Sequence, residues 1–253
     1  MARPRDPEKL IAAMRRRSKK LEAGLENDSA RRPRGRPRGR AEAWGGAFEL
    51  VLICTGNRVR SPIAEAFLRH LLADLPVELR SLGTLELGEA PPLPEALEAA
   101  AFLGFDISGH RARAIHGHDL SGADLVIGFE QRHAAAAVVE GGALRERTFL
   151  LTELVELLAD SRPEPFGEPV ERARQAVAKA HARRTQFGAA TAVELADPLG
   201  QDRSFYRNTV ERVRDLSTRL AIGLFGEDAV RPLATPVRAE SGRGSRRGSS
   251  HGR

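Results

Sequence analysis

The segment CTGNRVRS at positions 54–61 combines a nucleophile with groups that bind anions. Cys54 supplies a thiol, and Arg60 supplies a planar guanidinium that can hold two phosphate oxygens at once. Gly56 and Asn57 tolerate the left-handed backbone that a loop needs to point successive N–H groups inward as an anion-binding nest. The segment therefore predicts a loop that holds a phosphate group beside a thiol.

The same loop predicts how the thiol becomes reactive. A helix that begins at the end of the loop directs its N–H groups and its dipole toward negative charge, which favours the thiolate form of Cys54. Ser61 can donate a hydrogen bond to that thiolate, and again when the sulfur departs as a leaving group. We expect Asn57 to brace the loop. The expected phosphate-binding residues are Thr55, Gly56, Asn57, Arg58, Val59 and Ser61.

The flanking residues predict a strand before the loop and a helix after it. Residues 50–53 are apolar throughout, which is typical of a strand buried on both faces of a parallel sheet. Pro62 suits the first turn of a helix, with Ser61 as its N-cap. Further strands are expected at 77–81, 123–128 and 147–151, and helices at 64–72, 95–103, 129–140, 152–158 and 204–224. This alternation predicts an α/β fold with a doubly wound, four-stranded parallel sheet.

The loop resembles the signature of the low-molecular-weight protein tyrosine phosphatases, in which a cysteine is followed after five residues by Arg and then Ser or Thr. Gly56 and Asn57 match the residues usual at their positions in that family. The resemblance covers about residues 48–225 and implies a flavodoxin-like fold. In such sheets ligands bind beyond the carboxyl ends of the strands, where Cys54 is expected.

Two further segments resemble parts of this family. SLGT at 81–84 is similar to a SAGT-like segment, and GFDISGHRAR at 104–113 resembles a loop with a histidine and an arginine. The first match implies that Ser81 helps to brace the phosphate loop. The second makes His110 a brace on Asn57 and Ser81, not a ligand of the substrate.

Asp197, in the segment ELADPLG, is the expected general acid. Pro198 biases it toward an extended conformation and stiffens the loop that presents its carboxyl group. An Asp-Pro pair is an ordinary turn signal, so the assignment depends on the family resemblance, which places an aspartate before the final helix. Asp202 is the nearest rival.

The resemblance implies a cysteine-dependent phosphatase. Cys54 would attack phosphorus in line while Arg60 and the loop N–H groups hold the equatorial oxygens, and Asp197 would protonate the departing oxygen. Water would then hydrolyse the phosphocysteine. The expected substrate is a phosphorylated protein, by family default a phosphotyrosine protein, or a small phosphomonoester. No metal or other cofactor is expected, since the seven histidines are scattered.

Several positions depart from the family. Val59 stands where many members have a second cysteine, and Leu199 where many have a tyrosine after Asp-Pro. LELG at 85–88 lacks the aromatic wall that often flanks the phosphotyrosine ring. Arg58 replaces a residue that is usually apolar and could favour an acidic substrate. Arsenate reduction with an external thiol therefore remains an alternative, as does an oxyanion-binding module tethered to DNA.

The charge is distributed unevenly along the chain. Residues 1–46 carry 14 Lys and Arg against 6 Asp and Glu, and residues 229–253 carry 6 against 1, which leaves a net charge of −7 on residues 47–228. Both ends are rich in Arg, Gly, Pro and Ser, so we expect disordered basic tails around one domain. PRGRP at 33–37 resembles an AT-hook and suggests contact with nucleic acid.

Three further expectations concern the domain itself. Residues 160–192 form an insertion relative to the family and could be a lid or a surface helix. No apolar run approaches the length of a membrane span, and the charged start lacks the pattern of a signal peptide. A single cysteine excludes a disulfide framework within the chain, and a cytoplasmic location is expected.

Overall fold

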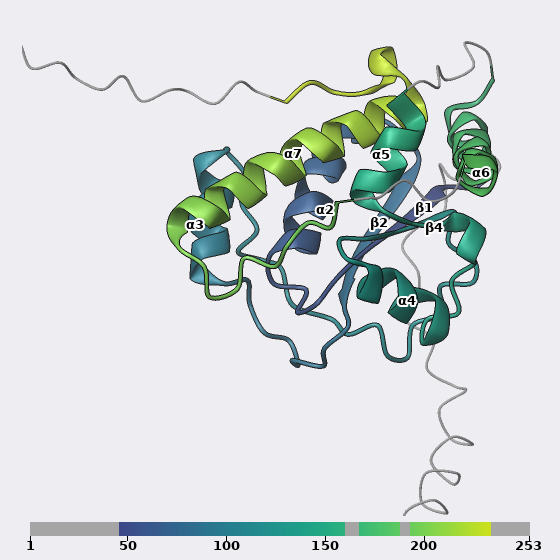
Figure 1. The fold of residues 1–253 in the computed structure, drawn as a ribbon. Coiled ribbons are helices and arrows are strands. Elements are labelled where there is room, and N and C mark those ends of the chain that lie inside the picture. The colour runs from purple at the N-terminus through teal and green to yellow at the C-terminus, as the bar shows by residue number, and fades with distance from the viewer. Residues whose placement is uncertain (1–45, 160–166, 188–192, 234–253) are drawn as a thin grey trace, which may run out of the picture. The chain divides into compact units, whose positions relative to one another are not determined.

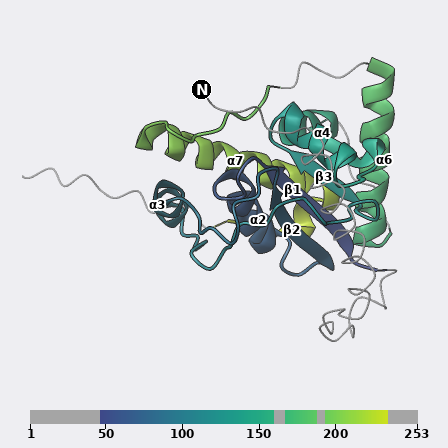
Figure 2. The ribbon, with the colours of Figure 1, turned by 90° about the horizontal axis from the view of Figure 1, so that it is seen from below.

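A computed structural model describes residues 46–159, 167–187 and 193–233. Four parallel strands form one sheet with helices on both faces (Figures 1 and 2). The strands are β1 (Phe48–Cys54), β2 (Val77–Gly83), β3 (Leu125–Gly128) and β4 (Thr148–Leu150). The helices are α2 (Arg60–Leu71), α3 (Pro94–Phe102), α4 (Gln131–Val139), α5 (Leu151–Ala159), α6 (Pro169–Phe187) and α7 (Arg203–Phe225), with short 3-10 helices at Arg145–Arg147 and Glu227–Ala229. The AT-hook-like segment lies outside the described residues.

The strand order β2-β1-β3-β4 places β1 inside the sheet. Cys54, the last residue of β1, pairs with Gly83 of β2, and Ile53 pairs with Gly128 of β3. The chain therefore leaves β1, β2 and β3 at one edge of the sheet. The connection after β1 leads to β2 on one side of β1, and the connection after β2 leads to β3 on the other side. The strand order therefore reverses at β1, and such sheets bind ligands at the carboxyl edge beside this point. The predicted flavodoxin-like, four-stranded parallel sheet is confirmed.

Alternate residues of β1 enter two separate cores. Leu50 and Leu52 belong to the larger apolar cluster, to which α2, α3, α5, α6 and α7 contribute. Val51 and Ile53 belong to a smaller cluster with residues of the 112–123 loop and of α4. Burial on both faces explains why this strand is apolar at every position and not only at alternate ones.

Helix α2 starts two residues earlier than an N-cap at Ser61 would allow. Its first residue is Arg60, and Val59 occupies the N-cap position without a capping side chain. The prediction that Ser61 caps the helix is therefore wrong. The hydroxyl group of Ser61 instead turns toward the loop, where it contacts Cys54 and Asn57.

Residues 169–187, in the region predicted to be an insertion, contribute a helix to the core. One face of α6 is buried in the larger cluster through Val170, Ala173, Ala176, Val177 and Ala180. This helix packs against α5 and α7 at the side of the sheet (Figure 1). Arg174 on α6 also pairs with Asp124, whose carboxylate accepts the N–H of Glu49. Of the two expectations, residues 169–187 therefore match the surface helix, with one face buried in the core and the other exposed.

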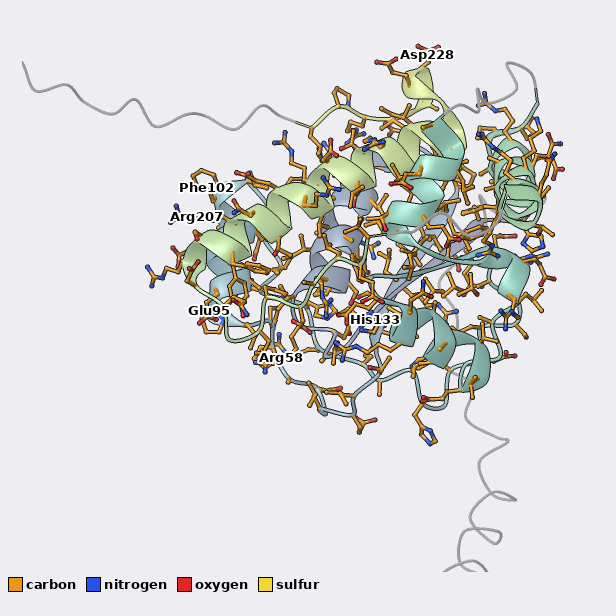
Figure 3. The ribbon with its side chains drawn as sticks, viewed as in Figure 1. Arg58, Glu95, Phe102, His133, Arg207 and Asp228 are labelled. Carbon is orange, nitrogen blue, oxygen red and sulfur yellow. The ribbon has the colours of Figure 1, made fainter. Side chains whose placement is uncertain are left out.

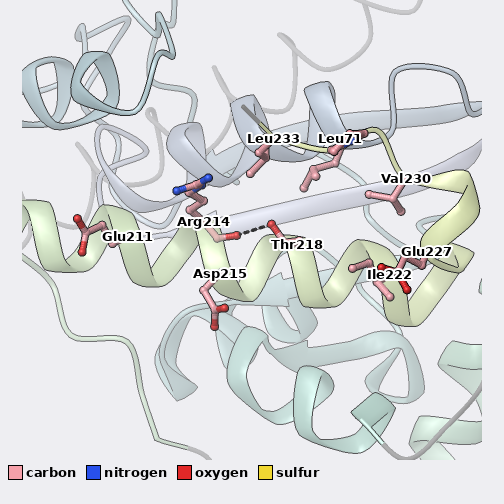
Figure 4. Close-up of a pocket in the computed structure, with 10 residues that line it drawn as sticks. Leu71, Glu211, Arg214, Asp215, Thr218, Ile222, Glu227, Val230 and Leu233 are labelled. Carbon is pink, nitrogen blue, oxygen red and sulfur yellow. Dashed lines mark hydrogen bonds between the residues drawn. The ribbon is translucent and has the colours of Figure 1, made fainter. Parts of the chain in front are cut away.

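Residues 229–233, which were predicted to belong to the basic C-terminal tail, pack on the domain. Arg231 donates its backbone N–H to Leu71 at the end of α2 and pairs with Asp74. Val230 and Leu233 pack against the larger cluster. Together with α7 this segment lines a pocket of about 540 Å³ at the end of α2 that is opposite to Arg60 (Figure 4). Residues 229–233 therefore belong to the folded domain.

Across the residues that the structure describes, no helix combines the length and apolar character needed to cross a membrane.

Candidate active site

The loop between β1 and α2 brings a thiol and a guanidinium to the carboxyl edge of the sheet. Cys54 is 2% exposed and Arg60 is 1% exposed, so both reactive groups are almost fully desolvated. Within the described part of the chain, the backbone N–H groups of residues 56–59 find no protein acceptor. Such N–H groups at a helix start suit an anion.

Asn57 fixes the shape of this loop. It is the one non-glycine residue with a positive φ in the described ranges, at 51°. Its side-chain amide donates to the hydroxyl groups of Ser61 and Ser81, each at 2.9 Å, and its side-chain oxygen accepts the backbone N–H of Arg113. His110 Nε2 donates to the backbone carbonyl of Asn57 at 2.8 Å. Asn57 therefore braces the loop in the way that the sequence predicted.

Two details of this brace differ from the prediction. His110 contacts Asn57, but among the described residues no hydrogen bond joins it to Ser81. Gly56 does not adopt the left-handed conformation, which in the loop belongs to Asn57 alone. The critical glycine is instead Gly83, where a Cβ atom would come within 2.9 Å of the Thr55 carbonyl oxygen and 3.0 Å of the Asn57 nitrogen. Close backbone approach, and not a positive φ, excludes a side chain there.

The thiol of Cys54 has one polar neighbour in the loop. Its sulfur lies 3.1 Å from the hydroxyl oxygen of Ser61. That oxygen accepts an N–H from Asn57, and its own hydrogen has two acceptors within reach, the sulfur at 3.1 Å and the Leu82 carbonyl oxygen at 3.4 Å. Ser61 is therefore arranged to stabilise a thiolate at Cys54.

Arg60 is held from two sides. Its Nη1 donates to the carboxylate of Glu130 and, at 2.7 Å, to the carbonyl oxygen of Leu195. Its Nη2 donates to Asp197 at 2.5 Å and to the hydroxyl oxygen of Thr55 at 3.2 Å. A buried guanidinium needs such partners, since an unpaired buried charge is strongly destabilising. These contacts bring Asp197 to the loop although 137 positions separate it from Arg60.

The rival aspartate has a structural role. Asp202 is the N-cap of α7 and accepts the backbone N–H of Phe205 at 2.9 Å. Asp197 is 27% exposed and accepts the backbone N–H of Leu199 with its other oxygen. The structure therefore places Asp197, and not Asp202, beside the thiol loop.

The start of α4 contributes two side chains to the site that were not predicted from the sequence. Glu130 and His133 form a capping box at the start of this helix, where the backbone N–H of Glu130 donates to His133 Nδ1. The side chain of His133 is labelled in Figure 3. His133 Nε2 lies 3.0 Å from the Thr55 hydroxyl oxygen. The available signal was the position of Glu130, which closely follows β3 at the edge where Cys54 ends β1. Parallel strands bring such residues together.

Two pKa values reflect this environment. Burial, followed by the charge of Arg60, lowers the pKa of His133 from 6.5 to about 4. Burial raises the pKa of Glu130, but hydrogen bonds and charges from Arg60 and Arg132 outweigh it and hold this pKa below its usual value. At neutral pH the site therefore contains a neutral histidine and an ionised glutamate.

The rim of the site is aliphatic and basic. Leu85, Leu87 and Leu199 are exposed, in keeping with the missing aromatic residues. Arg58 donates to the carbonyl oxygen of Pro91 at 2.6 Å (Figure 3). In the described ranges no group of three or more His, Cys, Asp or Glu residues is arranged to hold a metal ion.

Comparisons with known proteins agree with this geometry. The chain is 40% identical over 78 residues to the probable low molecular weight protein-tyrosine-phosphatase EpsP of Ralstonia nicotianae, an alignment that covers 31% of the chain and 52% of EpsP. It is 28% identical over 126 residues to a protein-arginine-phosphatase of Bacillus subtilis, which covers 49% of the chain and 83% of that enzyme. The chain thus spans about half the length of the first of these relatives.

Structural and family comparisons extend over more of the fold. The solution structure of a low molecular weight protein tyrosine phosphatase from Bacillus subtilis superposes with a TM-score of 0.51 at 22% identity, covering 71% of this chain and 99% of that protein. The sequence model of the low molecular weight phosphotyrosine protein phosphatases matches residues 49–187, which is more than half of the chain. The chain therefore belongs to the low molecular weight phosphotyrosine protein phosphatase family.

Proposed function

We propose that this protein hydrolyses phosphate monoesters through a phosphocysteine intermediate. The observation that carries the proposal is the convergence of a buried thiol and a buried guanidinium on a loop whose N–H groups lack protein acceptors. This arrangement offers a nucleophile and positive charge to the same phosphoryl group.

In the first step, the Cys54 thiolate attacks phosphorus in line with the leaving oxygen. Arg60 and the N–H groups of residues 56–59 stabilise the negative charge on the equatorial oxygens. Asp197 donates a proton to the leaving alcohol or phenol as its bond to phosphorus breaks. The products of this step are the free alcohol and a phosphoryl group bonded to sulfur.

In the second step, water attacks the phosphocysteine. Asp197, now ionised, accepts a proton from that water, and the sulfur departs as a thiolate. Ser61, 3.1 Å from the sulfur, stabilises the departing thiolate by a hydrogen bond. Inorganic phosphate then leaves, and the site returns to its starting protonation.

Asp197 must move away from Arg60 during this cycle. The two terminal nitrogens of Arg60 carry four N–H groups, which are committed to Glu130, Leu195, Thr55 and Asp197. A phosphate that binds along one edge of the guanidinium accepts the Nε N–H group and one N–H group of a terminal nitrogen. One of the four present partners must therefore leave. Asp197 is the more exposed of the two charged partners, so we propose that the phosphate monoester displaces it from Arg60. The released carboxylate then takes up a proton from solvent and acts as the acid.

The substrate side chain is a separate proposal. Phosphotyrosine is the family default, but exposed leucines replace the aromatic residues at the rim. One relative is a protein-arginine-phosphatase, so phosphoarginine is the second candidate. A tyrosine- and an arginine-phosphorylated version of one peptide would separate the two. A kcat/KM ratio above about tenfold for either peptide identifies the preferred class.

A metal-free assay with para-nitrophenyl phosphate tests the activity itself. We expect turnover by the wild type and competition by inorganic phosphate. Arsenate with a low-molecular-weight thiol should be run in parallel. Thiol oxidation that depends on arsenate, without ester hydrolysis, would replace the phosphatase by the reductase alternative.

The location of the protein, its domain organisation and its contact with nucleic acid are further proposals. We propose a cytoplasmic enzyme with one catalytic domain and basic ends, because a single cysteine suits a reducing compartment. The family match begins at residue 49 and gives no support to nucleic-acid contact by the N-terminal segment. Salt-dependent DNA binding by residues 1–46, absent from residues 47–233, would support that contact.

A further inference from the structure

His133 is a fully buried histidine that the proposed mechanism does not use. Its exposed fraction is 0%, and it lies on the face of α4 that contacts the thiol loop. Its Nδ1 accepts the backbone N–H of Glu130 at 3.1 Å. A neutral imidazole that accepts at Nδ1 carries its proton on Nε2. The fold of the helix start therefore determines the tautomer of His133.

Among the residues that the structure describes, the Nε2 proton of His133 has one acceptor at hydrogen-bond distance, since Glu130 Oε1 lies 4.0 Å from Nε2. The Thr55 hydroxyl oxygen lies 3.0 Å away, so His133 donates to Thr55. The same oxygen accepts an N–H from Arg60 Nη2 at 3.2 Å. Hydrogen bonds thus run from the start of α4 through His133 and Thr55 to the guanidinium that is expected to bind phosphate. Arg132 also reaches Thr55, at 3.3 Å, but from an exposed position.

Resting on the proposed function, we propose that His133 is a positioning residue that acts through Thr55 to hold Arg60 in the orientation that binds phosphate. His133 does not touch the substrate. Its imidazole fixes the hydroxyl oxygen of Thr55 at one place, and that oxygen fixes one edge of the guanidinium. Without this link, Arg60 retains Glu130 and Leu195 on its other nitrogen but loses one of the two neutral contacts that define its plane.

Binding of inorganic phosphate tests the proposal without any need for turnover. Calorimetric titration of the full chain would compare wild type with His133→Leu, Thr55→Val and the double variant. Each single variant should weaken phosphate binding about tenfold, and the double variant should be no weaker than either, because both remove the same link. His181→Leu is the matched control, since His181 bonds Arg184 on α6, away from the loop.

Two conservative variants separate positioning from general damage. Thr55→Ser retains the hydroxyl group and should keep phosphate affinity within about twofold of wild type. His133→Gln can place an amide N–H near the position of Nε2 and should recover part of the affinity. In assays of turnover, KM should rise with the phosphate dissociation constant. Thr55→Val tests the link even if His133→Leu does not fold, because Thr55 is only partly buried in the loop.

The outcomes also separate this proposal from the proposed function. If the wild type binds phosphate but does not hydrolyse esters, the proposed phosphatase activity is wrong. The phosphate titrations still test the role of His133 in that case. Unchanged affinity in Thr55→Val, or additive losses in the double variant, overturns the positioning role while turnover by the wild type persists. Wild type that neither binds phosphate nor hydrolyses esters overturns both.

Discussion

Arg60 and Asp197, 137 positions apart, are joined by an ion pair in which Nη2 and the carboxylate oxygen are 2.5 Å apart. The expected phosphate anchor and the expected general acid therefore bind each other in the structure. We therefore expect a phosphate dianion and the carboxylate of Asp197 to compete for the same guanidinium. Under the proposed mechanism, this competition would link substrate binding to the release of the acid.

Removal of the Asp197 carboxylate should have opposite effects on binding and on catalysis. Asp197→Ala should bind inorganic phosphate about fivefold more tightly, because a competing negative charge is gone. Its kcat/KM for an alkyl phosphate should fall roughly a hundredfold or more, since the leaving alkoxide then lacks an acid. A phenyl phosphate with a good leaving group should lose much less. These constants come from calorimetry and steady-state kinetics.

Asp202→Asn provides the control for Asp197, because asparagine also caps helices and Asp202 lies outside the loop. An alkyl phosphate rate that Asp197→Ala leaves unchanged would assign the acid role to another group.

Glu130→Gln should weaken the hold on Arg60. The neutral amide removes a charge-assisted hydrogen bond to a guanidinium that is 1% exposed. We expect kcat/KM for para-nitrophenyl phosphate to fall roughly ten- to a hundredfold. Glu194→Gln is the matched control, since Glu194 accepts the backbone N–H of Gln131 at the same edge without contacting Arg60. Equal rates in both variants would show that Glu130 is dispensable for Arg60.

Gly83→Ala should damage the loop from the neighbouring strand. Its Cβ would lie 2.9 Å from the Thr55 carbonyl oxygen, so the loop must shift by several tenths of an ångström. We expect kcat/KM to fall more than about tenfold, because catalytic geometry tolerates little displacement. Gly109→Ala has open space around its Cβ and should behave as wild type. Normal activity in Gly83→Ala would mean that the loop can shift to accommodate the new Cβ atom without any loss of catalytic geometry.

Acid should destabilise the protein through His133. Its pKa of about 4 lies below the ordinary 6.5, because burial and then Arg60 oppose its protonation, whereas Glu130 and Asp197 favour it. As the pH falls below 6.5, His133 therefore takes up a proton in the unfolded chain but stays neutral in the folded chain. The free energy of unfolding should drop by up to about 3 kcal/mol by pH 4, with full stability above 6.5.

Urea denaturation at several pH values measures this effect, with His133→Gln as the comparison. The variant should lose less stability than wild type between pH 6.5 and 4.5. Parallel losses in the two proteins would assign the acid sensitivity to other groups.

Local patterns predicted the elements that carry the thiol loop. The apolar run at 50–53 identified a strand buried on both faces, and Pro62 identified the first turn of the following helix. Residue spacing within one short segment was sufficient to predict that Cys54 and Arg60 lie at the two ends of the same loop. The cap was predicted wrongly because the hydroxyl group of a serine beside a loop can bond either to the helix N–H groups or to the loop. In this structure it bonds to Cys54 and Asn57.

Contacts between distant segments were harder to predict. Glu130 and His133 look like an ordinary helix start, and their relevance follows only from the pairing of β1 with β3. The charged sequence of α6 suggested solvent exposure, but its alanines and valines at helical spacing bury one face. Family resemblance, and not local pattern, was needed to select Asp197 from the acidic residues near the final helix.

The most direct test of the account is detection of the phosphocysteine. The enzyme is mixed with para-nitrophenyl phosphate, quenched in acid within milliseconds and digested, and the peptide that contains Cys54 is analysed by mass spectrometry. We predict one phosphoryl group on Cys54 in wild type, and neither this adduct nor turnover in Cys54→Ser, which should still bind inorganic phosphate. Turnover that persists in Cys54→Ser, or proceeds in wild type without phosphorylation of Cys54, would contradict the account.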